Sequence, residues 1–189
     1  MTTIVVVRKG SQAAIAADSL TTFGSTRLGP EYDRNPHKII RFADSFIGVA
    51  GSAAHQLVLE NLLGKNPDLA LHGKEAIYES FRRLHPLLKD EAFLNPKEEE
   101  DDPYESSQMT VMIANPSGIY AVYSMREVFE FDRFWAIGSG RDFALGAMFV
   151  AYGRAADPAK VAKIGIEAGA EYDTGTSLPL SLHTVTLAP

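Results

Sequence analysis

Two patterns of hydrophobic positions divide the chain into expected strands and helices. Continuous apolar runs at residues 4–7 and 13–17 are typical of strands buried on both faces, and the polar residues 9–12 between them indicate a tight turn. Further segments of this kind predict strands at 38–42, 46–50, 109–114, 119–123, 128–131, 134–137 and 182–187. A hairpin therefore opens the chain, and a strand closes it.

Helical spacing of apolar residues marks the second pattern. It predicts helices at 53–63, 74–88, 142–154 and 158–169. Gly64 fits a cap after the first helix, and Pro86 is expected to end or kink the second. Strands, two helices, strands, two helices and a strand follow in that order. Because strands and helices come in runs, we expect an α+β domain over residues 1–189, with helices packed on stacked sheets.

Two segments lack either pattern. Residues 24–37 are rich in Gly, Pro, Asn and Asp, which predicts a loop. The acidic run at 97–102 is bounded by prolines, which is typical of a solvated, mobile loop, with contact to a cation or a partner as the alternative.

Composition removes several classes of function. The net charge of −6 argues against a general nucleic-acid binder, and the absence of Cys excludes disulfides and thiolate metal sites. The five His show no metal-binding spacing, so no metal or cofactor is expected. No signal peptide or membrane span is evident, which predicts a cytoplasmic protein that does not interact with membranes.

The start of the chain offers a catalytic arrangement. Removal of Met1 would make Thr2 the N-terminal residue, with a hydroxyl and a free α-amine on one residue. An α-amine has a pKa of about 7.7–8.0, so part of it is neutral near pH 7 and can serve as a general base for the hydroxyl. Many ordinary chains also begin Met-Thr, so the hypothesis depends on the rest of the sequence.

An ordered set of short motifs resembles the proteasome β-subunit family, which includes the bacterial HslV peptidase. The motifs are TTIV at 2–5, AIAAD at 14–18, HKI at 37–39, GVAG at 48–51 and AIGSG at 136–140. Each is weak alone, but together they run through nearly the whole chain in the family's order. The resemblance implies the four-layer αββα sandwich of N-terminal nucleophile hydrolases and is strongest to stand-alone bacterial homologues of the proteasome.

The resemblance also implies roles for individual residues. Thr2 would be the nucleophile, its amine the base, and a cationic Lys38 oriented by Asp18 would ease deprotonation of the hydroxyl. Gly51 would supply a backbone N–H to the oxyanion, and Ser139 would bond around the amine. Without the family, Asp18 and Gly51 would be turn residues and Lys38 a surface lysine.

Residues 173–176, Asp-Thr-Gly-Thr, resemble the proteasomal Asp-x-x-Ser. Asp173 would brace the amine side of Thr2, and Thr176 would replace the usual Ser while keeping its hydroxyl. A turn after a helix is the alternative. The Gly138-x-Gly140 pair does not indicate a dinucleotide site, because Gly146 lies six residues after Gly140 instead of three.

Substrate recognition is expected beside the oxyanion glycine. Small and apolar side chains there would form the first pocket and favour an apolar substrate residue. These positions are Thr21, Ile40, Val49 and Ala53. Thr22 would pair with the substrate backbone as in strand addition.

Together these features predict a threonine endopeptidase that degrades unfolded polypeptides inside a closed chamber. By resemblance, the protein would be a homo-oligomer of stacked hexameric or heptameric rings, with an ATP-dependent unfoldase as a further partner. Two alternatives remain open from the sequence: a ring or assembly protein without catalysis, and a small-amide hydrolase on the same fold.

Overall fold

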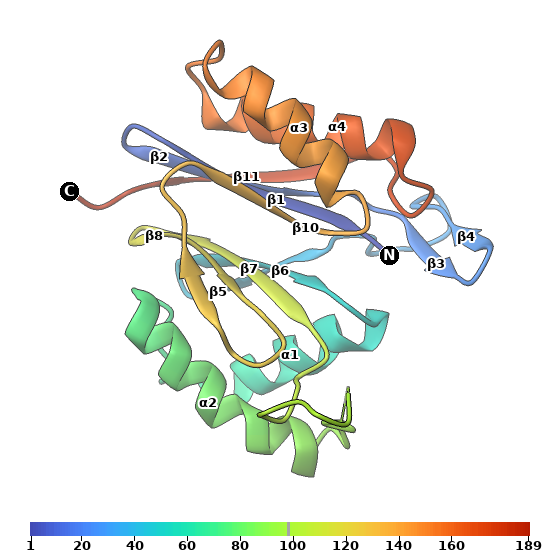
Figure 1. The fold of residues 1–189 in the computed structure, drawn as a ribbon, viewed down its shortest axis with the longest axis vertical. Helices are drawn as coiled ribbons and strands as arrows, with labels where there is room; N and C mark the ends of the chain where they lie inside the picture. The colour runs from blue at the N-terminus through green and yellow to red at the C-terminus, as the bar shows by residue number, and fades with distance from the viewer. Residues whose placement is uncertain (98) are drawn as a thin grey trace.

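Four layers build the molecule in a computed structural model that describes residues 1–97 and 99–189 (Figure 1). Helices α3 (Arg141–Tyr152) and α4 (Pro158–Tyr172) cover one sheet, and α1 (Ala53–Lys65) and α2 (Lys74–Asp90) cover the other. The two sheets face each other in the middle. This arrangement confirms the expected αββα sandwich.

The first sheet has the strand order β10-β1-β2-β11 and is antiparallel throughout. Its strands are β1 (Thr3–Lys9), β2 (Gln12–Ala17), β10 (Phe134–Gly138) and β11 (Ser181–Thr186). The apolar runs of β1 and β2 are buried because helices cover one face of this sheet and the second sheet covers the other. Thr3 pairs with Gly138, so the start of β1 lies beside the end of β10.

The second sheet has the order β5-β6-β7-β8-β9 and is also antiparallel. Its strands are β5 (Ile39–Phe42), β6 (Ser45–Ala50), β7 (Thr110–Asn115), β8 (Gly118–Val122) and β9 (Val128–Glu130). Gly48 of β6 lies against Ile4 of β1, where a Cβ would come within 2.8 Å of the isoleucine side chain. The absence of a side chain at Gly48 therefore lets the two sheets approach each other near the start of β1.

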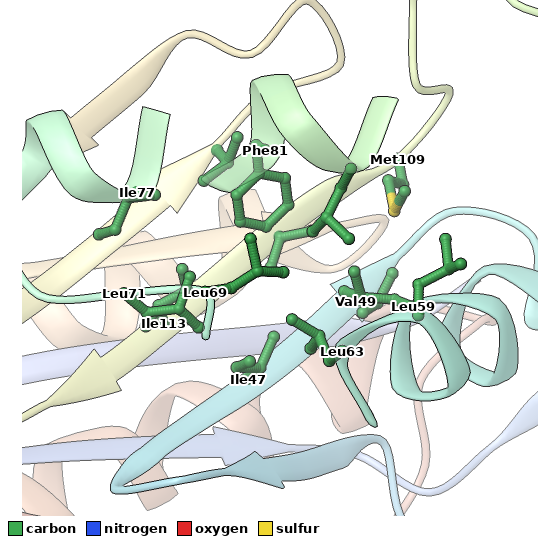
Figure 2. Packing of buried hydrophobic residues seen from close by; sticks show 14 of the residues in the cluster. Ile47, Val49, Leu59, Leu63, Leu69, Leu71, Ile77, Phe81, Met109 and Ile113 are labelled. Atoms are coloured by element: carbon green, nitrogen blue, oxygen red, sulfur yellow. The ribbon is translucent and has the colours of Figure 1, made fainter. Parts of the chain in front are cut away.

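Buried side chains fill the spaces between the layers. Figure 2 shows the cluster between α1, α2 and the second sheet, in which Phe81, Leu59 and Ile113 are buried. Ile4 and Met112 contribute to the cluster between the sheets. Burial of each large aliphatic or aromatic side chain contributes about 1.5–3 kcal/mol, so these clusters hold the sandwich together.

Two expectations about local structure were wrong. The segment expected as loop over 24–37 contains part of a hairpin, β3 (Thr21–Phe23) paired with β4 (Thr26–Leu28). Helix α1 passes Gly64 and ends at Lys65. Its C-cap is Asn66, whose side-chain amide donates to the carbonyl of Leu62 and so closes the last turn.

Helix α2 also continues past its proline, to Asp90. Pro86 removes one N–H from the helix, but residues on both sides of it remain buried against the second sheet, among them Leu84 and Leu88. Packing of this apolar face outweighs the lost hydrogen bond.

The acidic run at 97–102 is described except for residue 98. Glu99, Glu100 and Asp101 are exposed, and the Glu99 N–H donates to the Asp102 carboxylate at 3.0 Å. Across the described ranges, no helix combines the length and apolar character needed to traverse a bilayer.

Candidate active site

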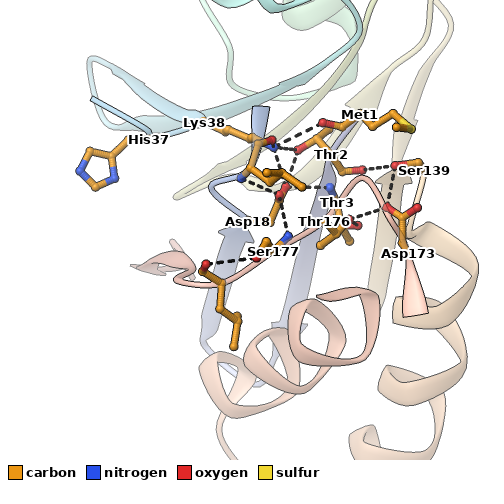
Figure 3. Close-up of polar contacts among 12 residues, drawn as sticks. Met1, Thr2, Thr3, Asp18, His37, Lys38, Ser139, Asp173, Thr176 and Ser177 are labelled. Carbon is orange, nitrogen blue, oxygen red and sulfur yellow. Dashed lines mark hydrogen bonds and ion pairs between the residues drawn. The ribbon is translucent and has the colours of Figure 1, made fainter. Parts of the chain in front are cut away.

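The hydroxyl of Thr2 lies in a three-way polar contact at the start of β1 (Figure 3). Its Oγ1 donates to Asp18 Oδ1 at 2.7 Å and accepts from Lys38 Nζ at 2.9 Å. Lys38 Nζ and Asp18 Oδ1 are themselves 2.8 Å apart. Thr2 is only 5% exposed. Three residues from separate segments of the sequence therefore meet at one oxygen atom.

Asp18 organises this contact from the end of β2. Its carboxylate is fully buried and accepts hydrogen bonds from several donors. These donors are Thr2 Oγ1, Thr3 N, Leu20 N, Lys38 Nζ and Ser177 N. A buried carboxylate is stable only when its oxygens are paired in this way. The carboxylate thus fixes both the hydroxyl and the ammonium group beside it.

Lys38 comes directly before β5 and reaches back across the site. Besides Thr2 and Asp18 it donates to the Leu20 carbonyl at 2.6 Å. Burial lowers the pKa of Lys38 below its ordinary value, and the Asp18 carboxylate opposes that shift without cancelling it. The ammonium is therefore held next to the hydroxyl in a setting that makes proton exchange easier than for a surface lysine.

A second group of residues surrounds the backbone of Thr2. The Ser139 N–H donates to the Thr2 carbonyl at 2.8 Å, and Ser139 Oγ donates to Asp173 Oδ2 at 2.7 Å. Thr176 Oγ1 donates to the same carboxylate oxygen at 2.6 Å. Burial raises the pKa of Asp173, but the hydrogen bonds from Thr176 and Ser139 outweigh it, so this pKa lies below its usual range.

Two glycines allow this group to close around the chain. Gly138 has φ +92°, and a Cβ there would overlap the Thr2 carbonyl oxygen. A Cβ on Gly140 would overlap Thr3 Oγ1. The Gly-Ser-Gly turn is therefore required for the close approach of β10 to the start of β1.

Met1 occupies the space next to this turn. Its carbonyl accepts from Lys38 Nζ at 3.4 Å, and its side chain lies against Gly175. With Met1 present, the Thr2 nitrogen is part of a peptide bond, and the free amine of Met1 adds an electrostatic contribution at Asp173. Removal of Met1 would transfer the free amine to Thr2.

The remaining predicted residues lie on elements around the site. Gly51 follows β6 with φ +153°, and Ala53 begins α1 two residues later. Thr21 and Thr22 are paired within the β3–β4 hairpin. Ile40 and Val49 are each only 7% exposed and belong to the buried cluster beneath α1 and α2.

Comparisons with known proteins identify chains that are similar to this one. No family model matches the chain. The structure of BPH from Thiobacillus denitrificans is 38% identical, covers 99% of both chains and has a TM-score of 0.93. The same protein in complex with epoxomicin is 38% identical over 99% of this chain and all of that chain, again with a TM-score of 0.93.

Two curated relatives, each named ATP-dependent protease subunit HslV, are more distant. The protein from Caldicellulosiruptor saccharolyticus is 27% identical over 89% of each chain, and that from Bartonella quintana is 26% identical over 97% of this chain and 89% of its own. Trypanosoma brucei HslV shares the fold, with a TM-score of 0.73 at 20% identity over 97% of this chain and 99% of its own. The chain belongs to the HslV and proteasome β-subunit family of threonine peptidases.

This threonine peptidase has further site residues that the sequence did not single out. Leu20 and Ser177 bind Asp18 through their backbones, and Thr3 shares a 2.6 Å hydrogen bond between hydroxyls with Thr176. Backbone contacts leave no trace in side-chain identity. Thr3 was within reach of sequence reasoning, because a polar residue in a run buried on both faces needs a partner.

Proposed function

We propose that Thr2, once Met1 has been removed, attacks peptide bonds with its own α-amine as general base. Thr2 Oγ1 adds to the carbonyl carbon of the substrate, and its proton passes to the amine. The Lys38 ammonium stabilises the developing alkoxide, and the Gly51 N–H binds the oxyanion. The C–N bond then breaks, and the leaving amine takes the proton.

Hydrolysis of the resulting ester completes the proposed cycle. A water molecule loses a proton to the Thr2 amine and adds to the ester carbonyl carbon. Oγ1 leaves and regains a proton, which restores the free threonine. Ser139 and Asp173 keep the amine in place throughout, and Thr176 holds Asp173. The observation that carries this proposal is the contact of Thr2 Oγ1 with Asp18 and Lys38 at 2.7 and 2.9 Å.

Polypeptides are the proposed substrates. The β3–β4 pair is hydrogen-bonded to neither sheet, so Thr21 and Thr22 can offer backbone groups to an extended substrate chain. Ile40 and Val49 would form the apolar floor of the first pocket, with Ala53 at its rim. An apolar side chain on the acyl side of the cleaved bond is therefore the expected preference.

The proposal extends to assembly and location. Residues 1–189 would act as one peptidase domain in the cytoplasm, in stacked rings of six or seven copies that enclose the sites. Two relatives carry the name ATP-dependent protease subunit, which supports an ATP-dependent unfoldase as a partner of this chain as well. Unfolded chains would then be the material that reaches Thr2.

Intact-mass spectrometry before and after incubation with a peptide epoxyketone tests the mechanism. We expect loss of the Met1 mass and one inhibitor adduct per chain, located at Thr2, since an epoxyketone needs both the hydroxyl and the free amine. A chain that has lost Met1 and gains no adduct would contradict the catalytic role and favour an assembly protein without catalysis. Cleavage of small amides without cleavage of casein would favour the small-amide hydrolase.

A further inference from the structure

The helix that follows Gly51 begins with an unusual form of capping. Ser52 is the N-cap of α1, and its side chain accepts from the backbone of His55, while His55 Nδ1 accepts from the Ser52 N–H at 3.1 Å. This reciprocal arrangement is a capping box, in which the third helical residue is ordinarily Glu or Gln. Here an imidazole, a titratable group, supplies the acceptor.

The same imidazole lies against Gly51. A Cβ on Gly51 would come within 2.8 Å of His55 Nδ1 and 3.1 Å of the Gln108 carbonyl oxygen. The histidine ring and the chain leading into β7 therefore occupy the space where a side chain at this position would lie. Its φ of +153° is one that glycine adopts most readily. Because glycine permits many backbone conformations, the contacts around it set the backbone at this position.

Position along β6 connects this turn to the nucleophile. Gly48 packs on Ile4, two residues after Thr2, and pairs with Ile39, the neighbour of Lys38. The strand then continues for two residues and ends at Ala50, directly before Gly51. The orientation of the peptide groups at Gly51 and Ser52 thus depends on the cap immediately beyond them.

Only the neutral ring can hold this cap. Accepting from Ser52 requires a lone pair on Nδ1, so the ring proton is on Nε2. Protonation would turn both ring nitrogens into donors and place a positive charge at a helix N-terminus, where the helix dipole disfavours it. Burial lowers the pKa of His55 below its ordinary value, which extends the neutral form to more acidic pH.

Other titratable groups lie on the elements around this turn. They are Glu60 on α1, His37 and Lys38 before β5, and Lys97 in the segment that contacts Gln108. Lys38 is bound to Asp18 and Leu20, and Gln56 bonds to the backbone of His37. Burial is the cause of the lowered pKa of His55.

We propose that His55 is a positioning residue for the reaction: its neutral ring binds the Ser52 N–H, packs on Gly51, and so holds the Gly51 N–H in the orientation that receives the oxyanion. This inference rests on the proposed function, because it assigns a support to the oxyanion donor. It adds a second titrating group to the reaction, since full kcat then requires both the Thr2 amine and His55 to be deprotonated.

The test compares the wild type with His55→Ala and His55→Gln over pH 5 to 8. Turnover of a fluorogenic peptide is divided by the number of sites that form an epoxyketone adduct, so unfolded protein does not count. At pH 7.5 we expect kcat of His55→Ala to fall about tenfold with KM nearly unchanged, a loss typical of one orienting hydrogen bond. His55→Gln, which restores a neutral acceptor, should stay within about twofold of the wild type.

The acid limb separates positioning from simple helix capping. Below the pKa of His55, wild-type kcat should fall more steeply with the proton concentration than kcat of His55→Gln, because the wild type loses its cap as well as its amine base. The ratio of kcat of His55→Gln to kcat of the wild type should therefore rise there and level off near the tenfold that His55→Ala loses. Asp157→Ala is the matched control, because Asp157 caps α4 through the Ala159 N–H at 2.8 Å and lies outside the proposed site. It should lower stability and leave kcat per site unchanged.

Two results would overturn the inference. If His55→Ala retains wild-type kcat, or if the ratio of His55→Gln to wild type stays constant across pH, the ring does not position the donor. If His55→Ala fails to fold, the pH dependence of the kcat ratio between His55→Gln and the wild type still tests the inference. A wild type that forms no adduct at Thr2 would overturn the proposed function and this inference together, whereas adduct formation with a flat ratio would overturn this inference alone.

Discussion

The two sides of Thr2 differ in how they are built. On the hydroxyl side, Asp18 is fully buried and Lys38 nearly so, with a side chain that is 12% exposed. On the backbone side, Ser139 and Asp173 are only partly covered and lie at the surface of the Gly-Ser-Gly turn. One side is part of the protein interior, and the other is open to solvent.

This difference assigns different demands to the two sides. The hydroxyl side must hold a charged pair in one geometry, and a buried pair tolerates no missing partner. In the proposed mechanism, the backbone side must accept a new group, the free amine that removal of Met1 would create. Substitutions on the hydroxyl side should therefore damage both stability and chemistry, whereas those on the amine side should mainly change the rate and its pH dependence.

Replacing the nucleophile itself should have the largest effect. Thr2→Ala removes the oxygen at the centre of the contact, and we expect kcat to fall at least about a thousandfold. Thr2→Ser keeps the hydroxyl and should retain measurable turnover. Peptide hydrolysis by purified protein of unchanged native mass is the measurement. Full activity of Thr2→Ala would refute the proposed mechanism, in which Thr2 is the nucleophile.

Lys38→Met tests the buried side. It should lower kcat by about a hundredfold or more, since the alkoxide loses its cation. It should also lower the free energy of unfolding by about 3–5 kcal/mol, because Asp18 is left as a buried, uncompensated charge. Urea denaturation and kinetics measure the two effects. The double variant Asp18→Asn/Lys38→Met should recover stability but not activity. A Lys38→Met variant as stable as the wild type would contradict the contrast between the two sides of Thr2.

Asp173→Asn tests the exposed side. We expect kcat to fall about tenfold and the acid limb of its pH profile to move to lower pH, because a positive Thr2 amine loses the carboxylate that favours it. Midpoints from kcat measured between pH 5 and 9 would show the shift. An unchanged midpoint would mean that Asp173 does not act on the amine.

The same residue gives a smaller, pH-dependent effect on stability. The folded-state pKa of Asp173 is lowered, so its contribution to stability is present above the unfolded pKa of about 3.9 and is lost as pH falls through the folded value. The free energy of unfolding of the wild type should therefore exceed that of Asp173→Asn at pH 6, and the difference should shrink as pH falls through the folded value. Urea midpoints at pH 3 and pH 6 would detect this difference. Thr176→Ser, which keeps the hydroxyl, should behave like the wild type.

Most of the fold could be predicted from the sequence because burial leaves a strong pattern. The β-branched run of β1 predicted a strand covered on both faces, and the tight turn at 9–12 identified the alanine-rich run of β2 as its hairpin partner. The β3–β4 hairpin could not be predicted in this way, since its three-residue strands are largely exposed and carry no alternation. Helix α2 was predicted over 74–88, and it extends two residues further, to Asp90, with Pro86 inside it.

The site residues also differed in whether the sequence could predict them. Thr2, Asp18 and Lys38 were predicted by resemblance, and the structure brings them together. Chemistry of the residue types alone favoured turn and surface roles for Asp18 and Lys38, since nothing local reveals that they meet. The backbone donors of Leu20 and Ser177 were beyond reach, because every residue carries an N–H and only the fold decides where it points.

The carboxylate of Asp18 also bears on how such an enzyme is made. It binds groups from β1, from the approach to β5 and from Ser177, which lies 159 positions further along the chain. A ribosome delivers these segments one after another, so Thr2 emerges long before Ser177 does. In the proposed mechanism, the growing polypeptide therefore carries the nucleophile without its complete surroundings, which disfavours cleavage of neighbouring nascent proteins until synthesis is nearly over.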